Sequence, residues 1–585
     1  MRAAALTLAG LLAIACDDAG GGESGDSGGR PNLAQIPQTG FGAPTRPEPF
    51  EPGVMGARLY EDGAGGAGGG AVERACDAPY PALCDADGDG RGADCALALD
   101  CDDAAATVFP GAPERPGDGV DQDCDGTDPD LDDASGLFVT SDGRDEDPGT
   151  RAEPLATLTH AVELAAAAGL TAVFVAEGDY PESVTSAVSI HGGYDPADWS
   201  RDPQAHPVSL DALQVTAAPV AVTGLVLRGA LAVGPLDNTP ACDADACPAI
   251  VIEGNQINVD GMGPVGISVD FGPTIVVANT TRGGEMGPGF PAFGVLVGFE
   301  GPGVALIADN EVTVAVPDGP GAGIVVQGGA AAILANRITS ARGGLVAETN
   351  TPCGVSALFA GNAVTAAAGL NVTGALVTAA ANRLHVSAPQ DDVLAVRVLG
   401  GGDLLAVNNS VVVDGGGRRR QGVRCDDGAS VTLLNDSLLI GGAAQVSSGV
   451  DVDQACRGAR LVNNIIDVGQ AGVAAAVVVD GPIELRSNLL DPDPTVCLVE
   501  AGDCLGRLGE VNGCEWAGCV GAARNASADP VFVDPAAGDL HVLPPSPAVD
   551  QAQDPAALGL PLPTDIDGEP RPAGAGFDIG ADEVQ

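Results

Sequence analysis

Two short acidic loops carry the residues whose types and spacing best suit chemistry. Residues 85–90 read DADGDG and residues 121–126 read DQDCDG. Each loop places carboxylates at alternate positions before a glycine, which permits the sharp turn that brings their oxygens round one point. Oxygen ligands in this arrangement suit a hard divalent cation, so the sequence predicts Ca²⁺ binding at these loops.

The loops do not complete an EF-hand, because Ala96 stands where the first loop would need its bidentate glutamate. Residues 100–119 lie between the loops and contain DCDD, PGAPE and DG in that order. Together these segments resemble the MopE-type metal-binding repeat of bacterial surface proteins over about residues 85–130. Pro116 and Gly117 replace the cysteine that usually precedes the DG in that family, which leaves the disulfide pattern of the repeat open.

The spacing and the resemblance predict one set of calcium ligands. A solvated acidic linker without a bound ion is the alternative interpretation. The expected ligands are Asp85, Asp87, Asp89, Asp100, Asp102, Asp103, Asp121, Asp123, Asp125 and Asp128.

A repeat organises the larger part of the chain, from about Ile250 to Leu490. Each copy is a short apolar run, an Asn, one variable residue and an aliphatic residue, except that Thr281 takes the aliphatic place after Asn279, and copies follow one another at intervals of 20 to 31 residues. Such a period predicts a solenoid, and Val, Ile and Leu strands separated by turn residues favour a β-solenoid. Asn fits the turns because it accepts left-handed backbone angles and because its amide can bond a neighbouring coil. The repeated positions are Asn255, Asn279, Asn310, Asn336, Asn362, Asn382, Asn409, Asp436 (in the Asn place), Asn464 and Asn488.

The two ends of this region carry further signals. SDGRDEDPGT, a short amphipathic helix ended by Gly169, VFVAEGDY and GGYD follow one another in an order that resembles the entry of right-handed parallel β-helix proteins of the pectin-lyase-like class. The resemblance implies that the helix covers the open end of the stack. Residues 526–585, with DLHV, SPAVD, DIDGEPRP and DIGADE, resemble the closing segment of the same proteins. The apolar face of the helix is expected to comprise Leu155, Leu158, Val162 and Ala165.

The N-terminus resembles a bacterial lipoprotein signal. Arg2 precedes an apolar run that ends in small residues before Cys16. The resemblance implies lipidation of Cys16 and attachment to a membrane through that lipid, whereas an ordinary cleaved signal peptide is the alternative. Both interpretations predict export. Residues 16–74 are rich in Gly, Asp, Ser and Pro and are predicted to form a flexible tether.

Composition narrows the choice of partners and of redox compartment. Eighty acidic residues against 26 basic ones give a net charge of −54, which repels nucleic acid and attracts divalent cations. Cys16 aside, 14 cysteines remain, and an even number in an exported protein predicts disulfides rather than a zinc site. The pairs close enough to form are Cys242–Cys247, Cys497–Cys504 and Cys514–Cys519, and Cys425–Cys456 would join neighbouring coils.

An enzyme of the pectin-lyase-like class would need a strong base beside calcium ligands, or paired carboxylates. The pairs at 391–392 and 426–427 lack the sequence patterns of polygalacturonases, and we interpret His191 as structural. Residues 250–490 contain no Tyr or Trp to stack on a sugar. The basic cluster Arg418, Arg419 and Arg420 is the candidate contact for an anionic glycan, and a solvated loop is the alternative.

The sequence therefore predicts a lipid-anchored, non-enzymatic protein of the cell envelope, at the outer membrane or cell surface. Its all-β, right-handed parallel β-helix would serve for display, adhesion or the binding of a glycan or protein ligand, with no nucleic-acid partner. A polysaccharide lyase or glycoside hydrolase is the alternative. The expected parts are a signal peptide (1–15), a tether (16–74), a metal-binding module (75–133), the β-helix (134–525) and its closing segment (526–585).

Overall fold

The structure is a computed structural model of the chain. Residues 1–101 and several short internal segments lie outside the described residues, and with them Cys16, Asp85, Asp87, Asp89, Asp100 and Asp103. The described residues are 102, 105–234, 249–259, 263–283, 291–299, 304–315, 320–349, 354–388, 392–415, 417–442, 444–469, 472–491, 496–498, 503–505, 507–558 and 562–585.

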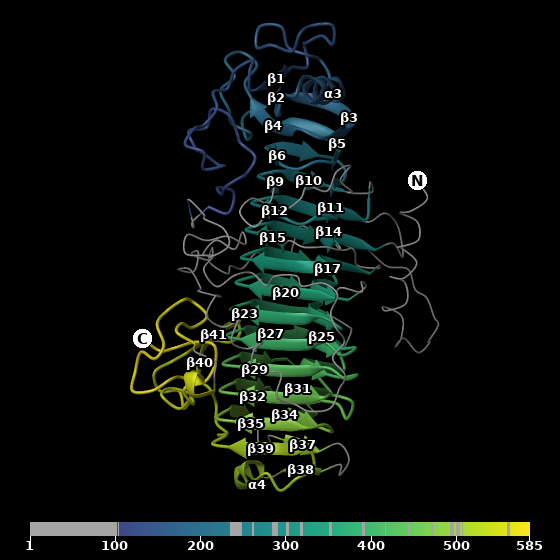
Figure 1. The fold of residues 1–585 in the computed structure, drawn as a ribbon. Helices are drawn as coiled ribbons and strands as arrows, with labels where there is room; N and C mark the ends of the chain where they lie inside the picture. The colour runs from purple at the N-terminus through teal and green to yellow at the C-terminus, as the bar shows by residue number, and fades with distance from the viewer. Residues whose placement is uncertain are drawn as a thin grey trace, which may run out of the picture. The chain divides into compact units, whose positions relative to one another are not determined.

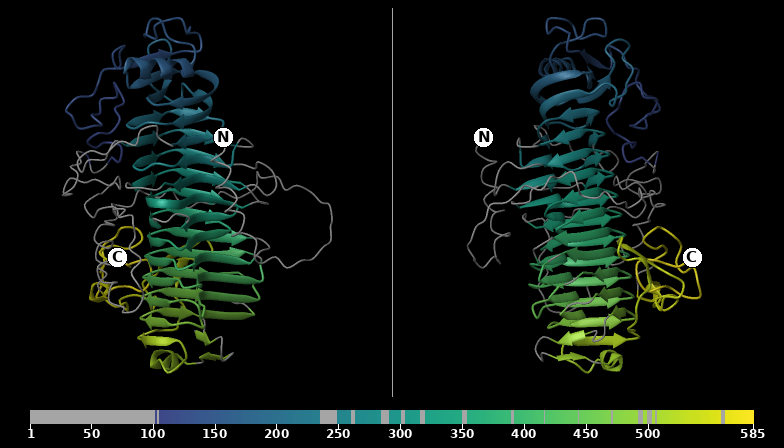
Figure 2. Two further views of the ribbon diagram at one scale, coloured as in Figure 1. Left: turned by 45° about the vertical axis from the view of Figure 1, so that its right-hand side comes forward. Right: turned by 180° about the vertical axis from the view of Figure 1, so that it is seen from behind.

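The chain winds into coils, and each coil adds one short strand to each of three parallel faces (Figures 1 and 2). The first face consists of β1 (Gly136–Val139), β2 (Ala172–Ala176), β4 (Ser189–Tyr194), β6 (Val220–Thr223), β9 (Ile250–Glu253), β12 (Thr274–Val277), β15 (Val304–Ala308), the second half of β17 (Gly321–Leu334), β20 (Val355–Ala360), β23 (Leu376–Ala380), β26 (Asp403–Val407), β29 (Ser430–Leu434), β32 (Gly458–Val462), β35 (Ile483–Arg486) and β39 (Cys519–Ala523).

The other two faces follow in chain order within each coil. The second face consists of β3 (Gly178–Ser186), β5 (Val208–Val215), β7 (Leu225–Leu227), β10 (Gln256–Asn258), β13 (Thr280–Gly283), β16 (Glu311–Val314), β18 (Arg337–Ser340), β21 (Ala363–Ala366), β24 (Arg383–Ala388), β27 (Ser410–Gly415), β30 (Ser437–Ile440), β33 (Ile465–Val468) and β36 (Leu489–Asp491). The third consists of β8 (Leu231–Val233), β11 (Val265–Val269), β14 (Ala292–Gly298), the first half of β17, β19 (Gly343–Glu348), β22 (Ala368–Thr373), β25 (Val393–Leu399), β28 (Arg419–Cys425), β31 (Val446–Val452), β34 (Val473–Val479) and β37 (Val496–Leu498), with β38 (Asp503–Leu505) antiparallel to β37.

One continuous core of aliphatic side chains fills the interior of the coils. Strand residues alternate between this core and the outer surface, as in β24 and β25, because successive side chains of a strand point to opposite faces. The strands pair in parallel with the equivalent strands of neighbouring coils. The predicted fold class, an all-β parallel β-helix, is therefore confirmed.

The repeated asparagines form a hydrogen-bonded column, the Asn ladder, at the turn between the first and second faces. In a typical rung, the backbone N and the Nδ2 of Asn336 both donate to Oδ1 of Asn362, at 3.0 Å each, and Nδ2 also donates to the carbonyl of Ile307 at 2.7 Å. The amide thus bonds neighbouring coils, as predicted. Asp436 occupies its expected place and accepts two hydrogen bonds from Asn409.

One part of the turn prediction is wrong, because the ladder asparagines themselves are not left-handed. The residue before each of them has the positive φ, for example Ala335 at 53° and Ala381 at 51°. The ladder residue itself turns its side chain into the stack, where the amide is buried. Asn does take the left-handed position at Asn408, Asn435 and Asn463, each of which precedes a ladder residue.

The ladder also extends beyond the repeat that the sequence shows. Asn488 donates to Asn525, 37 residues later, and Asn525 donates in turn to Oδ1 of Asn512. Asn512 belongs to the short helix α4 (Leu508–Gly513), which was not predicted and follows the last complete coil. The helix therefore supplies the final acceptor of the column.

A helix covers the opposite end of the stack. The helix α3 (Leu158–Ala168) begins after its N-cap Thr157 and ends at Gly169, whose φ of 74° is left-handed. Its face of Leu158, Val162 and Ala165 packs on the core, as the apolar pattern predicts, and Ala161 joins it. Leu155 is buried in the same core but precedes the helix.

Residues 526–585, the flank segment, lie against the side of the coils rather than across the end of the stack, as both views of Figure 2 show. The segment contains β40 (Phe532–Asp534), β41 (Asp539–Val542) and a 3₁₀ turn at Pro555–Leu558. Its Phe532 and Leu540 cover outward-facing Val412 of the second face. The sequence predicts a closing segment at 526–585 without giving its position, and the structure places these residues along the side of the coils.

Hydrogen bonds to the left-handed asparagines explain why the flank segment binds there. Asn435 Nδ2 donates to the carbonyl of Asp578 at 3.0 Å, and Asn408 Nδ2 donates to that of Thr564 at 2.9 Å. Asn463 both donates to and accepts from Gln553. These three side chains point outward from the turn and pair with the backbone of the flank segment, which the repeat pattern alone could not show.

Three predicted disulfides are present. Cys425–Cys456 joins neighbouring coils across 31 residues, and Cys497–Cys504 and Cys514–Cys519 are local. Cys242 and Cys247 lie outside the described residues. In the part of the chain that the structure describes, no helix is both long enough and apolar enough to cross a membrane.

Candidate metal centre

Residues 105–130, the motif loop, contain no helix or strand and are held in shape by turns (Figure 1, upper left). The backbone N of Phe109 donates to the carbonyl of Gln122 at 2.8 Å, and the backbone N of Arg115 donates to Oε1 of the same residue at 2.9 Å. Gln122 is therefore the link between the first and second halves of the loop. These bonds bring Glu114 beside the carboxylates that follow the turn.

Three carboxylates converge in the motif loop: those of Glu114, Asp121 and Asp123 each offer an oxygen within 4.8 Å of the other two. Oε1 of Glu114 accepts a hydrogen bond from the backbone N of Asp123 at 2.7 Å. Oε2 of Glu114 is buried and has no hydrogen-bond partner among the described residues. A buried oxygen without a partner is unfavourable unless another ligand satisfies it.

The electrostatics of the cluster favour a positive ligand. Burial raises the pKa of Glu114 to about 7. The charges of Asp123 and Asp121 add to this effect, and hydrogen bonds with the backbone of Asp123 and Gln122 oppose it. Burial and the neighbouring Asp125 and Asp121 also raise the pKa of Asp123. Carboxylates that repel one another in this way gain when a divalent cation lies between them. All of the atoms that could bind a metal here are carboxylate oxygens, which favour a hard cation over a soft metal that prefers thiolate ligands.

The other predicted ligands of this loop have structural contacts. Asp128 accepts from the backbone N of Gly117 and of Gly119, at 3.1 and 2.7 Å, which ties the two halves of the loop together. Oδ1 of Asp125 accepts from both the backbone and the hydroxyl of Thr127. Asp102 belongs to the described residues but not to the converging group. Of the expected ligands, the structure thus brings Asp121 and Asp123 together.

Glu114 is the ligand candidate that the sequence reasoning omitted. It stands seven residues before Asp121, outside the alternating pattern that drew attention to the aspartates. The signal that could have found it is the glutamate of the PGAPE element, which the MopE-type pattern contains. An acid that completes a site from a separate turn cannot be recognised from local spacing alone.

The three arginines at 418–420 do not form one contact surface. Arg418 and Arg419 are exposed, whereas Arg420 is buried and donates from Nη1 to the carbonyl of Gly441 at 2.7 Å. Consecutive residues of a strand point to opposite sides, and Arg420 follows Arg419 in β28. Arg420 is therefore corrected from a candidate ligand contact to a structural residue.

A second charged cluster lies in the flank segment. His541 bonds Asp539 through Nδ1 and Asp567 through Nε2, the latter at 2.5 Å, and a carboxylate oxygen of Asp582 lies close by. The hydrogen bonds that the ring donates to Asp567 and Asp539 raise the pKa of His541 to about 9, so the ring is a cation at neutral pH. Asp567 also pairs with Arg383 of β24 at 2.5 Å. The cluster therefore already contains the positive charge that its carboxylates require.

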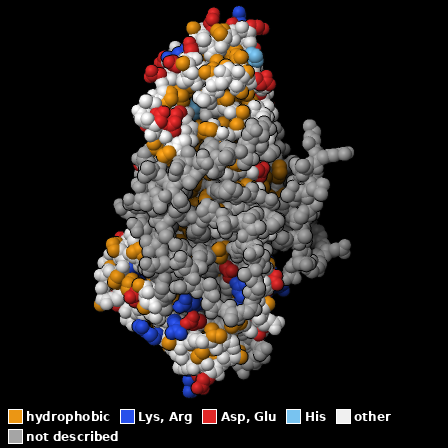
Figure 3. Space-filling model, viewed as in Figure 1, with side chains coloured by type: hydrophobic (Ala, Val, Ile, Leu, Met, Phe, Trp, Pro, Cys, Tyr) orange, Lys and Arg blue, Asp and Glu red, His pale blue; other side chains and the backbone are white. Residues whose placement is uncertain are grey.

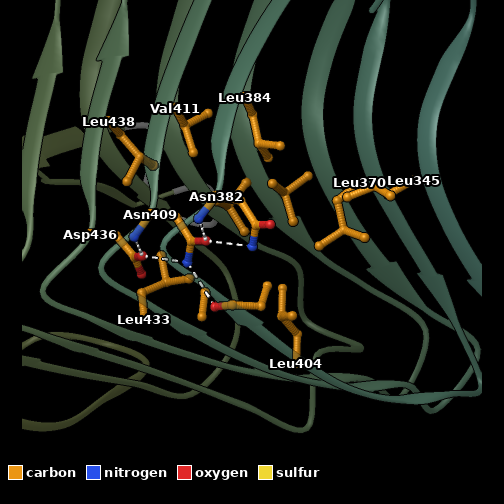
Figure 4. A pocket seen from close by; sticks show the side chains of 14 residues that line it. Leu345, Leu370, Asn382, Leu384, Leu404, Asn409, Val411, Leu433, Asp436 and Leu438 are labelled. Carbon is orange, nitrogen blue, oxygen red and sulfur yellow. Dashed lines mark hydrogen bonds between the residues drawn. The ribbon is translucent and has the colours of Figure 1, made fainter. Parts of the chain in front are cut away.

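A small cavity lies inside the coils beside the Asn ladder, lined by Asn382, Asn409, Asp436 and leucines such as Leu404 (Figure 4). Its volume of about 20 Å³ holds about one water molecule. It is thus too small for a sugar. His191 is also fully buried, with Nδ1 3.1 Å from Oγ1 of Thr223, and burial lowers its pKa well below the usual range. Both features belong to the interior of the fold.

Comparison with known proteins supports the metal-binding motif. Residues 100–130 match the family model of the Cu-binding MopE metal-binding motif. Among solved structures, the chain is similar to pectate lyase Pel9A, with 11% identity and a TM-score of 0.32 over 77% of this chain and 98% of that one. It is also similar to XylC in its complex with xylose, with 9% identity and a TM-score of 0.24 over 76% and 98% of the two chains. No curated protein matches the sequence.

Proposed function

We propose that this chain is a non-enzymatic, lipid-anchored protein of the cell envelope that binds Ca²⁺ through its motif loop. The β-helix serves as a rigid scaffold for display, adhesion or the binding of a glycan or protein ligand. The observation that carries the calcium proposal is the convergence of Glu114, Asp121 and Asp123, with one buried oxygen of Glu114 that has no hydrogen-bond partner among the residues that the structure describes.

Several features support Ca²⁺ as the ion. The three side chains offer only carboxylate oxygens, and the chain as a whole carries a net charge of −54, which concentrates divalent cations near its surface. Acidic side chains gather on the loops at the upper left of the space-filling view (Figure 3). Ca²⁺ also accepts irregular ligand geometry more readily than Mg²⁺, which suits a site built from loop turns.

The scaffold role is supported by the way in which the stack is stabilised. The interior is filled by aliphatic side chains and by the Asn ladder, and the cavity beside the ladder has room for about one water molecule. Recognition by the β-helix is therefore assigned to its outer faces, where loops of unequal length follow the strands. Exposed Arg418 and Arg419 remain candidate contacts for an anionic ligand.

The calcium proposal is tested by isothermal titration of the full chain with Ca²⁺. The chain should bind Ca²⁺ with a stoichiometry of about one at this loop, and E114Q should weaken binding by about tenfold or more, because a neutral amide replaces a charged ligand. E146Q changes an exposed glutamate outside the loop and should bind as the unaltered chain does. Equal affinity of E114Q and E146Q would contradict the assignment.

A screen against polysaccharides tests the non-enzymatic part. The chain is incubated with neutral and acidic glycans in Ca²⁺ and in chelator, and new reducing or unsaturated ends are measured. No turnover is expected. Calcium-dependent release that is lost in R419A or in D426N would overturn the proposal in favour of a polysaccharide lyase or glycoside hydrolase.

The lipid anchor at Cys16 is tested by fractionation. The unaltered chain should sediment with membranes and should incorporate labelled fatty acid. C16S should appear in the soluble exported fraction without label, since the acceptor sulfur is gone. Membrane association of C16S that equals that of the unaltered chain would contradict lipid anchoring at this residue.

A further inference from the structure

The motif loop is docked on the outer surface of the first face. Phe109 is fully buried and, with Ala112, packs in one apolar cluster with Val251 of β9 and Ile275 of β12. Beside this cluster, Nη2 of Arg115 lies 3.3 Å from Oε2 of Glu253, at the end of β9. The loop therefore has both an apolar and an ionic attachment to the β-helix.

The residues that dock and the residues that converge on the metal centre alternate along one short stretch of chain. Glu114, whose carboxylate faces Asp121 and Asp123, directly precedes Arg115, which reaches Glu253. The side chain of Gln122, between the two aspartates, accepts from the backbone of Arg115 at 2.9 Å and is itself almost fully buried. Movement of one set of groups thus moves the other.

Without a cation, the repulsion among the three carboxylates acts against this arrangement. The repulsion would be relieved if the turn of Glu114 moved away from the turn of Asp121 and Asp123, and the buried Oε2 of Glu114 would then reach water. Such a movement would pull Arg115 from Glu253 and would break the bond of Arg115 to Gln122. A bound cation neutralises the repulsion among the three carboxylates and so stabilises the docked arrangement.

We propose that cation binding at Glu114, Asp121 and Asp123 and docking of the motif loop on the first face are coupled, so that the cation fastens the loop to the β-helix. This inference rests on the proposed calcium binding. The two equilibria are linked: if a bound cation increases the docking equilibrium constant by some factor, docking increases the affinity for the cation by the same factor. The β-helix surface around Val251 and Glu253 is therefore part of what sets the affinity of the site.

The test measures Ca²⁺ affinity by titration in full-length variants altered only on the β-helix side. E253Q should weaken Ca²⁺ binding by about threefold, and V251D, which sets a charge against Phe109, by about tenfold. E484Q is the matched control. Glu484, in the distant strand β35 of the first face, also pairs with an arginine: its Oε2 lies 3.1 Å from Nε of Arg460 in the neighbouring strand β32. The affinity of E484Q should equal that of the unaltered chain.

Hydrogen exchange of amides 105–130 gives a second readout that does not depend on affinity. Ca²⁺ should slow exchange in the unaltered chain and in E484Q, and should slow it less in E253Q. If the unaltered chain binds Ca²⁺ but E253Q and V251D bind equally well, the coupling is overturned while the proposed function stands. If V251D does not fold, E253Q alone decides. No Ca²⁺ binding by the unaltered chain overturns both proposals.

Discussion

The Asn ladder and the motif loop both gather polar side chains in sheltered places, yet their bonding differs in kind. Along the ladder each amide offers a donor to the next acceptor, and helix α4 supplies the last acceptor through Asn512. In the motif loop, acceptors face acceptors, and Oε2 of Glu114 has no partner among the described residues. The comparison teaches that polar groups whose donors and acceptors are all paired have a structural role. A cluster with more hydrogen-bond acceptors than donors is instead a candidate site for a positive ligand.

Asp436 lies between these two cases, because it is an acid inside the ladder. Its Oδ1 accepts from Asn409 as an amide oxygen would, but its Oδ2 takes the place of the nitrogen and has no hydrogen-bond partner in the described part of the chain (Figure 4). Neighbouring ladder residues donate from that position to the next Oδ1. Burial raises the pKa of Asp436 to about 7, so the acid is held largely in its protonated form below neutral pH.

The largest expected effect comes from breaking the ladder at its middle. N336A leaves the backbone N of Asn310 and the carbonyl of Ile307 without partners in the interior, which should lower the free energy of unfolding by about 4 kcal/mol. Urea unfolding followed by circular dichroism measures this. N258A, at a half-buried asparagine outside the ladder, should change it by less than about 1 kcal/mol. Equal losses would show that the ladder contributes no special stability.

The next effect concerns pH and Asp436. Because the folded-state pKa is raised above the unfolded value, the folded state retains the proton, and stability should fall as pH rises from about 4 to about 7, by about 3 kcal/mol in total. D436N, which restores the ladder donor, should remove this dependence and be the more stable protein at pH 8. Melting temperatures across pH measure it, with D427N, an exposed position, as control. A dependence unchanged in D436N would refute the assignment.

Calcium should stabilise the motif loop without affecting the ladder. At a concentration of about 100 times Kd, a ligand that binds only the folded state adds about 2.7 kcal/mol to the unit that it stabilises. Thermal scans with Ca²⁺ and with chelator should differ by the same amount in the unaltered chain and in N258A, and should differ by at most about half of that free energy in E114Q, because its affinity is lower by about tenfold or more. A difference in E114Q as large as that in the unaltered chain would place the ion elsewhere.

The smallest effect is expected at His541, where a cation is already present. Its raised pKa of about 9 means that the stability from its bonds to Asp539 and Asp567 is fully present below about pH 6.5 and is lost as pH rises through 9. Since the ring is about two-fifths exposed, solvent screening limits the effect to about 1 kcal/mol. H541Q should flatten the melting temperature between pH 7 and 10, whereas H160Q, on the outer side of α3, should not.

The sequence predicts the repeating parts of the molecule well and the non-repeating contacts poorly. The Asn spacing is sufficient for the parallel coils and even for the place of Asp436, because every coil must present the same group at the same turn. Asn525 follows Asn488 after 37 residues and therefore lies outside the range of spacings that defines the repeat. The side-chain pattern also places the left-handed residue one position too late, because backbone angles do not follow from side-chain types alone.

The candidate site shows the same division. Alternating aspartates are a local pattern, and two of them, Asp121 and Asp123, do converge. Glu114 enters from another turn, and the burial of Arg420 depends on strand alternation that three consecutive arginines conceal. The lateral position of the flank segment depends on contacts such as Asn435 to Asp578, across 143 residues of sequence. Contacts of that range require the folded coils to exist first.

The lateral attachment of the flank segment has a consequence for biogenesis. During synthesis the coils around Asn435 can stack as they emerge, but their outward amides and Val412 stay uncovered until the residues near Asp578 and Phe532 have been made. This side of the stack is therefore the last to mature. A nick or premature stop in the final 60 residues would leave intact coils with an adhesive stripe along one side, and self-association would begin there.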